Sequence, residues 1–172
     1  MQIFTYQNLP MIKQLFTGAL AAFTIATPVQ ARIEAGSAAL FETLQQVGVN
    51  IDVNPESCGT GFDGYYNSDK RYMILCIADV PTANDGNTLR HESWHHLQAC
   101  AARKRGKSGI RPVLEDDTEL KAFVAKVLPQ AQIDRIVNSY GAKSVPNELE
   151  AFASAQYFSS TEITQLLKHW CN

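Results

Sequence analysis

Apolar and polar positions between residues 34 and 53 follow first the period of a helix and then that of a strand. Leu40, Leu44 and Val47 share one helical face, so the segment from Glu34 to Val47 is predicted to be an amphipathic helix. From Val49 to Val53, apolar and polar residues alternate, which predicts a half-buried strand. This part of the chain is therefore predicted to form one helix and one strand.

Two more strands are predicted on either side of a polar turn. Tyr65 and Tyr66 begin the first, residues 67–70 form the turn, and Arg71 to Ala78 form the second, stronger strand. The preceding residues 58–64 are rich in glycine but lack the strand-to-helix context of a phosphate-binding loop. They are interpreted as backbone turns.

The remainder of the chain is predicted to be helical. Residues 84–87 form a turn with good N-cap residues, a helix runs from Thr88 to about Arg103, and Gly106 ends it. Four further helices are predicted at residues 116–128, 131–140, 146–158 and 161–170. A small antiparallel or mixed sheet packed on the helix 88–103, followed by a helical C-terminal half, is an α+β fold.

The N-terminal region has the three parts of a secretory signal peptide. Lys13 supplies a positive charge, residues 15–26 are uncharged and mainly apolar, and Val29-Gln30-Ala31 places small residues at the cleavage positions. We expect residues 1–31 to be removed and residues 32–172 to form a single domain. An uncleaved anchor is the alternative, although the apolar run is short for a membrane span. The prediction is a secreted or periplasmic protein whose mature form has no stable membrane span.

The charge of the chain does not indicate a nucleic-acid partner. The sequence has 15 basic and 17 acidic residues and a net charge of −2. Its basic cluster, Arg103 to Arg105 with Lys107, follows the longest predicted helix, where positive charge favours the helix dipole. The cluster is interpreted as a solvated helix end.

Export accounts for the four cysteines. An even number of cysteines in an oxidising compartment predicts two disulfides, for which three pairings are possible. We favour Cys58–Cys76, between adjacent elements, and Cys100–Cys171, between the long helix and the end of the chain. The rival interpretation, a structural zinc bound by cysteine, lacks a Cys-x-x-Cys pair.

The sequence His91-Glu92-Ser93-Trp94-His95 carries the candidate chemistry. Two histidines four residues apart on a helix leave the same face and can bind one Zn²⁺. Glu92 can reach a water bound to that ion, whose pKa the metal lowers, and act as general base. The motif therefore predicts metal-assisted hydrolysis.

This stretch resembles the active-site helix of the zincin metallopeptidases. The extended metzincin pattern is excluded, because Gln98 and Ala101 stand where it requires glycine and histidine. A third ligand must then come from elsewhere, and residues 147–151 (Asn-Glu-Leu-Glu-Ala) resemble the downstream helix of gluzincin-type enzymes. The resemblance implies a minimal zincin in which Met73 to Ala78 lines the cleft and its exposed edge pairs with an extended substrate.

Glu148 and Glu150 compete for the role of third ligand, because side chains two apart on a helix point about 200° apart. The resemblance favours Glu148, with the small Ala151 one turn later allowing close helix approach. Periodicity agrees, placing Glu148 on an inward stripe and Glu150 with polar neighbours. Phe152 departs from the related families, which have Asp or Ser at that position.

The resulting prediction is a secreted zinc peptidase with one Zn²⁺ per chain, held by His91, His95 and Glu148, acting on a peptide or protein. The alternative functions are an exported binding or inhibitory module with a structural or vestigial zinc, an envelope protein without metal, and a hydrolase of another amide. The oligomeric state stays open. His96 is expected to bond a neighbour and His169 to lie at the surface. The oxyanion donor also stays open among five side chains: Tyr65, Tyr66, Tyr140, Tyr157 and His96.

Overall fold

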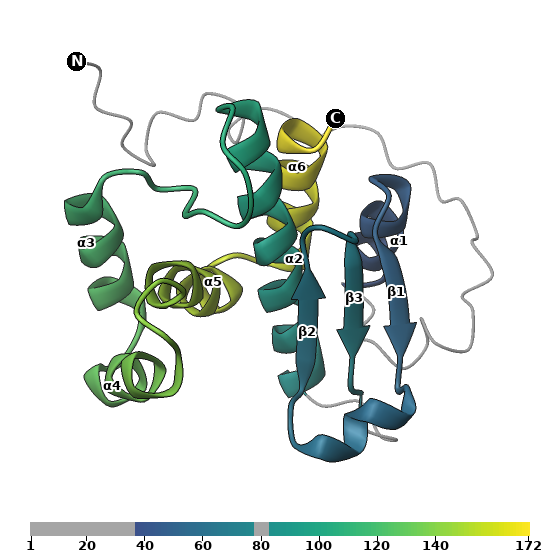
Figure 1. Ribbon diagram of the computed structural model, residues 1–172, viewed down its shortest axis with the longest axis horizontal. Helices are drawn as coiled ribbons and strands as arrows, with labels where there is room; N and C mark the ends of the chain where they lie inside the picture. The colour runs from purple at the N-terminus through teal and green to yellow at the C-terminus, as the bar shows by residue number, and fades with distance from the viewer. Residues whose placement is uncertain (1–36, 78–82) are drawn as a thin grey trace.

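The computed structural model describes residues 37–77 and 83–172 and confirms the α+β class (Figure 1). The predicted signal peptide, residues 34–36 and Ala78 lie outside these ranges. The elements are helix α1 (Ala38–Gln46), strands β1 (Asn50–Val53), β2 (Gly64–Asn67) and β3 (Tyr72–Leu75), the 3₁₀ segment η4 (Glu56–Thr60) between β1 and β2, and helices α2 (Ala83–Lys104), α3 (Asp117–Val127), α4 (Gln130–Ser139), α5 (Val145–Tyr157) and α6 (Ser160–Trp170).

The sheet is mixed, with the strand order β1-β3-β2. β1 pairs parallel to β3, and β2 pairs antiparallel to β3. The expectation that the strand beginning at Met73 offers an exposed edge is therefore wrong, because β3 is the central strand. β2 is the edge strand that packs against α2 (Figure 1).

α2 is the helix around which the domain is built, since it packs against β2, β3, α5 and α6. Trp94 and Leu97 are almost completely buried on its inner side, and the Trp94 ring stacks on Phe158 at 5.2 Å between centroids. From β3, Met73 and Leu75 enter the same core. Buried apolar surface of this kind dominates the stability of small domains.

α2 begins earlier than predicted. Residues 84–87, expected to form a turn, lie in its first turns, with the acidic Asp85 near the positive end of the helix dipole. Asp85 is also buried, so tertiary packing outweighs the local turn preference. The helix ends as predicted, two residues before Gly106, whose φ of +69° favours glycine. Within the described ranges, neither α2 nor any other helix is long and apolar enough to cross a membrane.

Both favoured disulfides are present. Cys58–Cys76 joins η4 to the residue after β3, and Cys100–Cys171 joins α2 to the residue after α6. The second closes 71 residues of chain, for which the loss of chain entropy in the unfolded state gives a stabilisation of roughly 4 kcal/mol. It therefore fixes the C-terminal helix against the helix that carries the candidate site.

Candidate metal centre

His91 and His95 lie one turn apart on α2 and point to the same place. Their Nε2 atoms are 3.1 Å apart, and the two rings meet edge to face. Both side chains are largely buried where α2 packs against α5. The spacing read from the sequence thus brings two imidazole nitrogens together as expected.

Glu148 enters the same cluster from the first turn of α5. Its Oε2 lies 3.4 Å from the Nε2 atom of each histidine. Ala151, one turn later, is fully buried, so α5 lies close to α2 as the resemblance implied. Burial alone would raise the pKa of Glu148, but the two imidazoles lower it to about 2, so the group is a carboxylate.

The three donors fit a zinc ion. Ligands placed 2.0–2.1 Å from zinc at tetrahedral angles are about 3.3 Å apart, close to the separations of 3.1 and 3.4 Å between these donors. Burial lowers the pKa of His91, which favours the neutral imidazole that binds metal. No fourth His, Cys, Asp or Glu of the described chain joins this group. A catalytic zinc site similarly uses three protein ligands and leaves one position open.

Gln98 sets the orientation of His95. The Gln98 Nε2 amide donates to the backbone carbonyl of Asn147 (3.0 Å) and to Oε2 of Glu150 (2.8 Å). Its Oε1 therefore faces His95 Nδ1 at 2.9 Å and accepts the proton of that nitrogen. In the neutral ring this contact places the proton on Nδ1, so that Nε2 can bind a metal. Burial lowers the pKa of His95, but the Glu148 and Glu92 carboxylates outweigh burial and raise it, so a metal would displace a proton from Nε2.

The environment of Glu150 differs from the one predicted from the sequence. The sequence pattern places it among polar neighbours, but the structure buries it completely. Its carboxylate accepts hydrogen bonds from Trp94 Nε1, Gln98 Nε2 and the backbone N–H groups of residues 113 and 114, at 2.8–3.1 Å. Burial raises the pKa of Glu150, whereas these four donors favour its charged form. The contact of Gln98 with His95 could be predicted from their spacing of three residues on one helix. No pattern in the neighbouring sequence predicts that residues 113 and 114 contact Glu150.

Glu92 lies at a cleft beside the donors. The cleft has a volume of about 310 Å³ and also borders β2, α5 and the loop before α5. Its lining residues are Gly61, Phe62, Asp63, Gly64, Asn84, Asn87, Thr88, His91, Glu92, Tyr140 and Phe152. Burial, together with the negative charge of Glu148, raises the pKa of Glu92 to about 7, although His95 opposes the shift. A carboxyl group with such a pKa can accept and release a proton near neutral pH.

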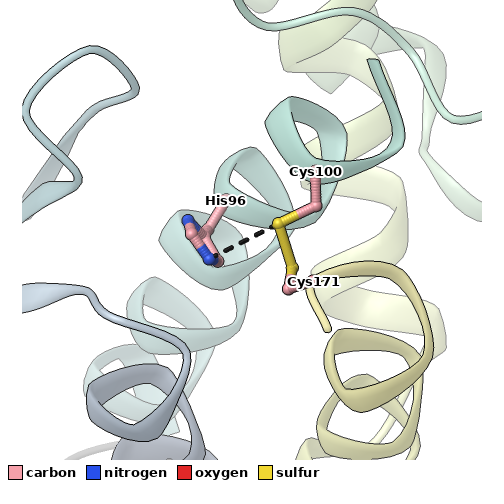
Figure 2. Close-up of side chains that lie close together, drawn as sticks. All are labelled: His96, Cys100 and Cys171. Carbon is pink, nitrogen blue, oxygen red and sulfur yellow. Dashed lines mark hydrogen bonds between the residues drawn. A yellow bond between two sulfur atoms is a disulfide. The ribbon is translucent and has the colours of Figure 1, made fainter. Parts of the chain in front are cut away.

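Of the two other histidines and the candidate oxyanion donors, most lie outside this cleft. His96 shares a hydrogen bond with Tyr66 and does not line the cleft. It lies beside Cys100 (Figure 2), and His169 is exposed on α6. Of the five candidate oxyanion donors, Tyr140 alone is among the lining residues. Burial and the charges of Glu148 and Glu92 raise the pKa of Tyr140, which keeps its hydroxyl protonated.

Phe152 packs against the cluster, at a position where the enzymes that the motif resembles carry Asp or Ser. Its ring centroid lies 4.3 Å from that of His91. An aromatic ring at this point supplies an apolar wall to the cleft and restricts the rotation of the imidazole. It offers no acceptor for a ring N–H, so Phe152 cannot give His91 the kind of contact that Gln98 gives to His95.

Comparisons with known proteins yield no match: no protein-family model, curated protein or solved structure is similar enough to this chain to be recognised. The functional interpretation therefore depends on the residues described above.

The first prediction concerns Gly64, where β2 passes closest to Glu92. A Cβ atom added there would lie 2.7 Å from Thr88 Cγ2 and 2.9 Å from Glu92 Cγ and Oε1. We expect Gly64→Ala to displace the Glu92 side chain and to lower the free energy of unfolding by about 1 kcal/mol or more, measured by urea denaturation. Gly59→Ala is the control, because its Cβ would have no atom within 4 Å. Equal stability of the two variants would contradict the proposed close approach.

The second prediction concerns the pH dependence of the metal-free protein. The pKa of Glu92 is about 7 in the folded state, against an ordinary value of 4.5 that applies to the unfolded chain. The folded state therefore binds more protons between these values, and stability falls as the pH rises through this window. In the presence of a chelator, Glu92→Gln should be more stable than the wild type at about pH 8, by up to about 3 kcal/mol, with the difference vanishing near pH 4.5.

The matched control is Glu56→Gln, because Glu56 is exposed. Its unfolding free energy should follow that of the wild type at every pH. If the unfolding free energy of Glu92→Gln also equals that of the wild type at every pH, ionisation of the buried Glu92 does not destabilise the folded state.

Proposed function

We propose that this protein is a zinc-dependent peptidase with His91, His95 and Glu148 as metal ligands and Glu92 as general base. The observation that carries the proposal is the convergence of three donors, 3.1–3.4 Å apart, beside a cleft that His91 and Glu92 line. A structural zinc is normally closed by four protein ligands, whereas this group has three among the described residues. The arrangement therefore favours an enzyme over a binding module with a structural zinc.

Four residues of the chain have separate roles in the proposed peptide hydrolysis. Bound zinc would act as a Lewis acid and lower the pKa of a water. Glu92 accepts a proton from the attacking water and passes it to the leaving amine, for which a pKa near neutrality is suited. Tyr140, at the same cleft, donates a hydrogen bond from its hydroxyl to the developing oxyanion. Gln98 and Glu150 keep His95 in the tautomer that binds metal.

The substrate is a peptide or a protein segment in an extended conformation. β2 is an edge strand: one of its edges pairs with β3, and no strand of the described sheet pairs with its other edge. Its first residue, Gly64, lines the cleft. A peptide strand added to this edge would pass beside Glu92, so β2 takes the role first expected of the strand at Met73.

The proposed enzyme is exported and acts in an oxidising compartment. Its two disulfides support this location, because such bonds persist mainly outside the reducing cytosol. This interpretation agrees with the signal peptide predicted at residues 1–31.

The third prediction separates the two glutamates by zinc content. We expect about one zinc per wild-type chain after dialysis against a mild chelator, measured by elemental analysis. Glu148→Gln should lose the metal, because it removes a ligand. Glu150→Gln should weaken binding by roughly 10- to 100-fold, as expected of an outer contact. Glu56→Gln, at an exposed glutamate, is the control and should keep its zinc. A zinc-free wild type, even after zinc is supplied, would contradict the proposal.

The fourth prediction concerns catalysis on a quenched fluorescent peptide library. Glu92→Gln should retain zinc and lose activity, because the base is gone. Tyr140→Phe should lower kcat by roughly 10²–10³ with little change in KM, the usual effect of losing one oxyanion donor. Tyr157→Phe is the control, since Tyr157 packs against Phe123 and does not line the cleft. An unchanged kcat in Tyr140→Phe would remove Tyr140 from the mechanism.

A further inference from the structure

A second group of metal-binding residue types lies on the opposite side of α2 from the candidate centre. His96, Cys100 and Cys171 place their ligand atoms within 4.8 Å of one another (Figure 2). His96 and Cys100 are almost fully buried, and Cys171 is partly exposed. In the structure the two cysteines form a disulfide, and His96 Nε2 lies 3.5 Å from Cys100 Sγ.

The position of His96 suits a metal ligand as well as the hydrogen bond to Cys100 Sγ that it makes in the oxidised protein. Nitrogen at about 2.0–2.1 Å and sulfur at about 2.3 Å from a tetrahedral zinc are about 3.5 Å apart. The separation of His96 Nε2 and Cys100 Sγ, 3.5 Å, matches this value. Cys171 follows the last residue of α6, so its side chain can rotate without disturbing a helix.

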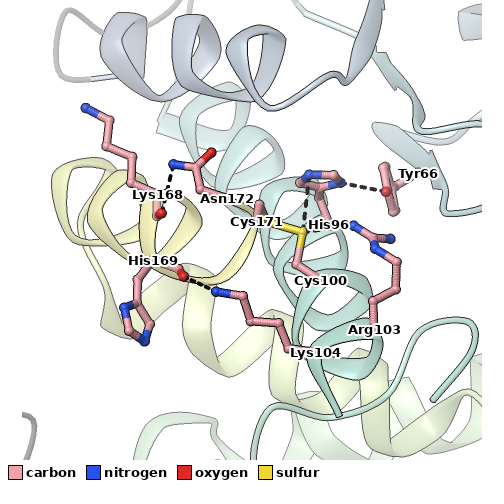
Figure 3. Close-up of a disulfide and its surroundings, with 9 residues drawn as sticks. All are labelled: Tyr66, His96, Cys100, Arg103, Lys104, Lys168, His169, Cys171 and Asn172. Atoms are coloured by element: carbon pink, nitrogen blue, oxygen red, sulfur yellow. Dashed lines mark hydrogen bonds between the residues drawn. A yellow bond between two sulfur atoms is a disulfide. The ribbon is translucent and has the colours of Figure 1, made fainter. Parts of the chain in front are cut away.

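Two further side chains hold this group in place (Figure 3). The Tyr66 hydroxyl lies 2.7 Å from His96 Nδ1, which fixes the ring with Nε2 toward the sulfur atoms. A metal-binding histidine usually has such a partner on its other nitrogen. The Arg103 Nη2 donates to Cys100 Sγ at 3.1 Å, and a guanidinium so placed stabilises a thiolate.

We propose that reduction of the Cys100–Cys171 disulfide creates a second metal site, with His96, Cys100 and Cys171 as ligands for a thiophilic ion such as Zn²⁺. It is independent of the proposed peptidase activity. The reductant is a dithiol. Its thiolate attacks Sγ of Cys171, the less buried of the two residues, and Cys100 leaves as a thiolate beside Arg103. The second thiol of the reductant then releases Cys171 and closes the reductant's own disulfide, so that two electrons pass to the protein.

Metal binding completes the change. The ion displaces the remaining thiol proton, and His96 coordinates through Nε2 while its Nδ1–H donates to the Tyr66 hydroxyl oxygen. Oxidation would reverse these steps and expel the ion. The chain thus binds an additional thiophilic ion only when the Cys100–Cys171 disulfide is reduced.

The test is a Co²⁺ titration of oxidised and phosphine-reduced protein, followed by absorption and far-ultraviolet circular dichroism. Thiolate bound to Co²⁺ gives a strong charge-transfer band in the near ultraviolet, which a site of two histidines and a glutamate cannot give. We expect this band in the folded, reduced protein alone, at one equivalent of Co²⁺ beyond what the oxidised protein binds. Cys171→Ser should abolish it, and Tyr66→Phe should keep the band but weaken Co²⁺ binding roughly 10-fold.

Three results would overturn the proposal. The first is a reduced, folded protein without the band. The second is a band of equal strength in Cys171→Ser, which would assign it to Cys58 and Cys76 instead. The third is a reduced chain that loses its helical dichroism and does not regain it when Co²⁺ is added.

Discussion

The carboxylate of Glu150 is the interaction on which the candidate site depends. A charge that is completely removed from water is tolerated only when hydrogen bonds replace its hydration. Glu150 obtains four of them, from Trp94 and Gln98 on α2 and from the backbone of residues 113 and 114. One side chain thus joins α5, α2 and the segment that precedes α3. Because these bonds fix α5 against α2, they also fix how near Glu148 comes to the two histidines.

The two glutamates of α5 illustrate how one helix serves stability and chemistry together. Side chains two residues apart diverge, so Glu148 reaches the histidines while Glu150 reaches the interior. α2 is used in the same way on three faces. It presents His91 and His95 to the donor cluster beside the cleft, Trp94 to the core, and His96 with Cys100 to the C-terminal disulfide. A local spacing of three or four residues explains each pairing on this helix.

The sequence predicts those features of the fold that depend on neighbours along the chain. The pairing of His91 with His95 and most helix boundaries are of this kind, and the approach of Glu148 agrees with a resemblance to a known motif. Features set by distant contacts are less accessible. The interpretation of β3 as an edge is wrong because period-two alternation does not report strand order. The burial of Glu150 escapes prediction because its donors at residues 113 and 114 are 37 and 36 residues away.

Glu92 differs from Glu150 in a way that bears on function. Both carboxyl groups are buried, but Glu150 is surrounded by donors, whereas Glu92 faces a cleft and lies so close to Gly64 that a Cβ atom added there would be 2.9 Å from its Oε1. A buried acid with few donors costs stability at neutral pH, and natural sequences seldom keep one in a purely structural role. The same environment leaves Glu92 free to exchange a proton with a bound molecule. Within the described part of the chain, Glu150, which holds the helices together, therefore receives four hydrogen bonds. Glu92, which lies where the proposed chemistry would occur, is left with few donors and can exchange its proton.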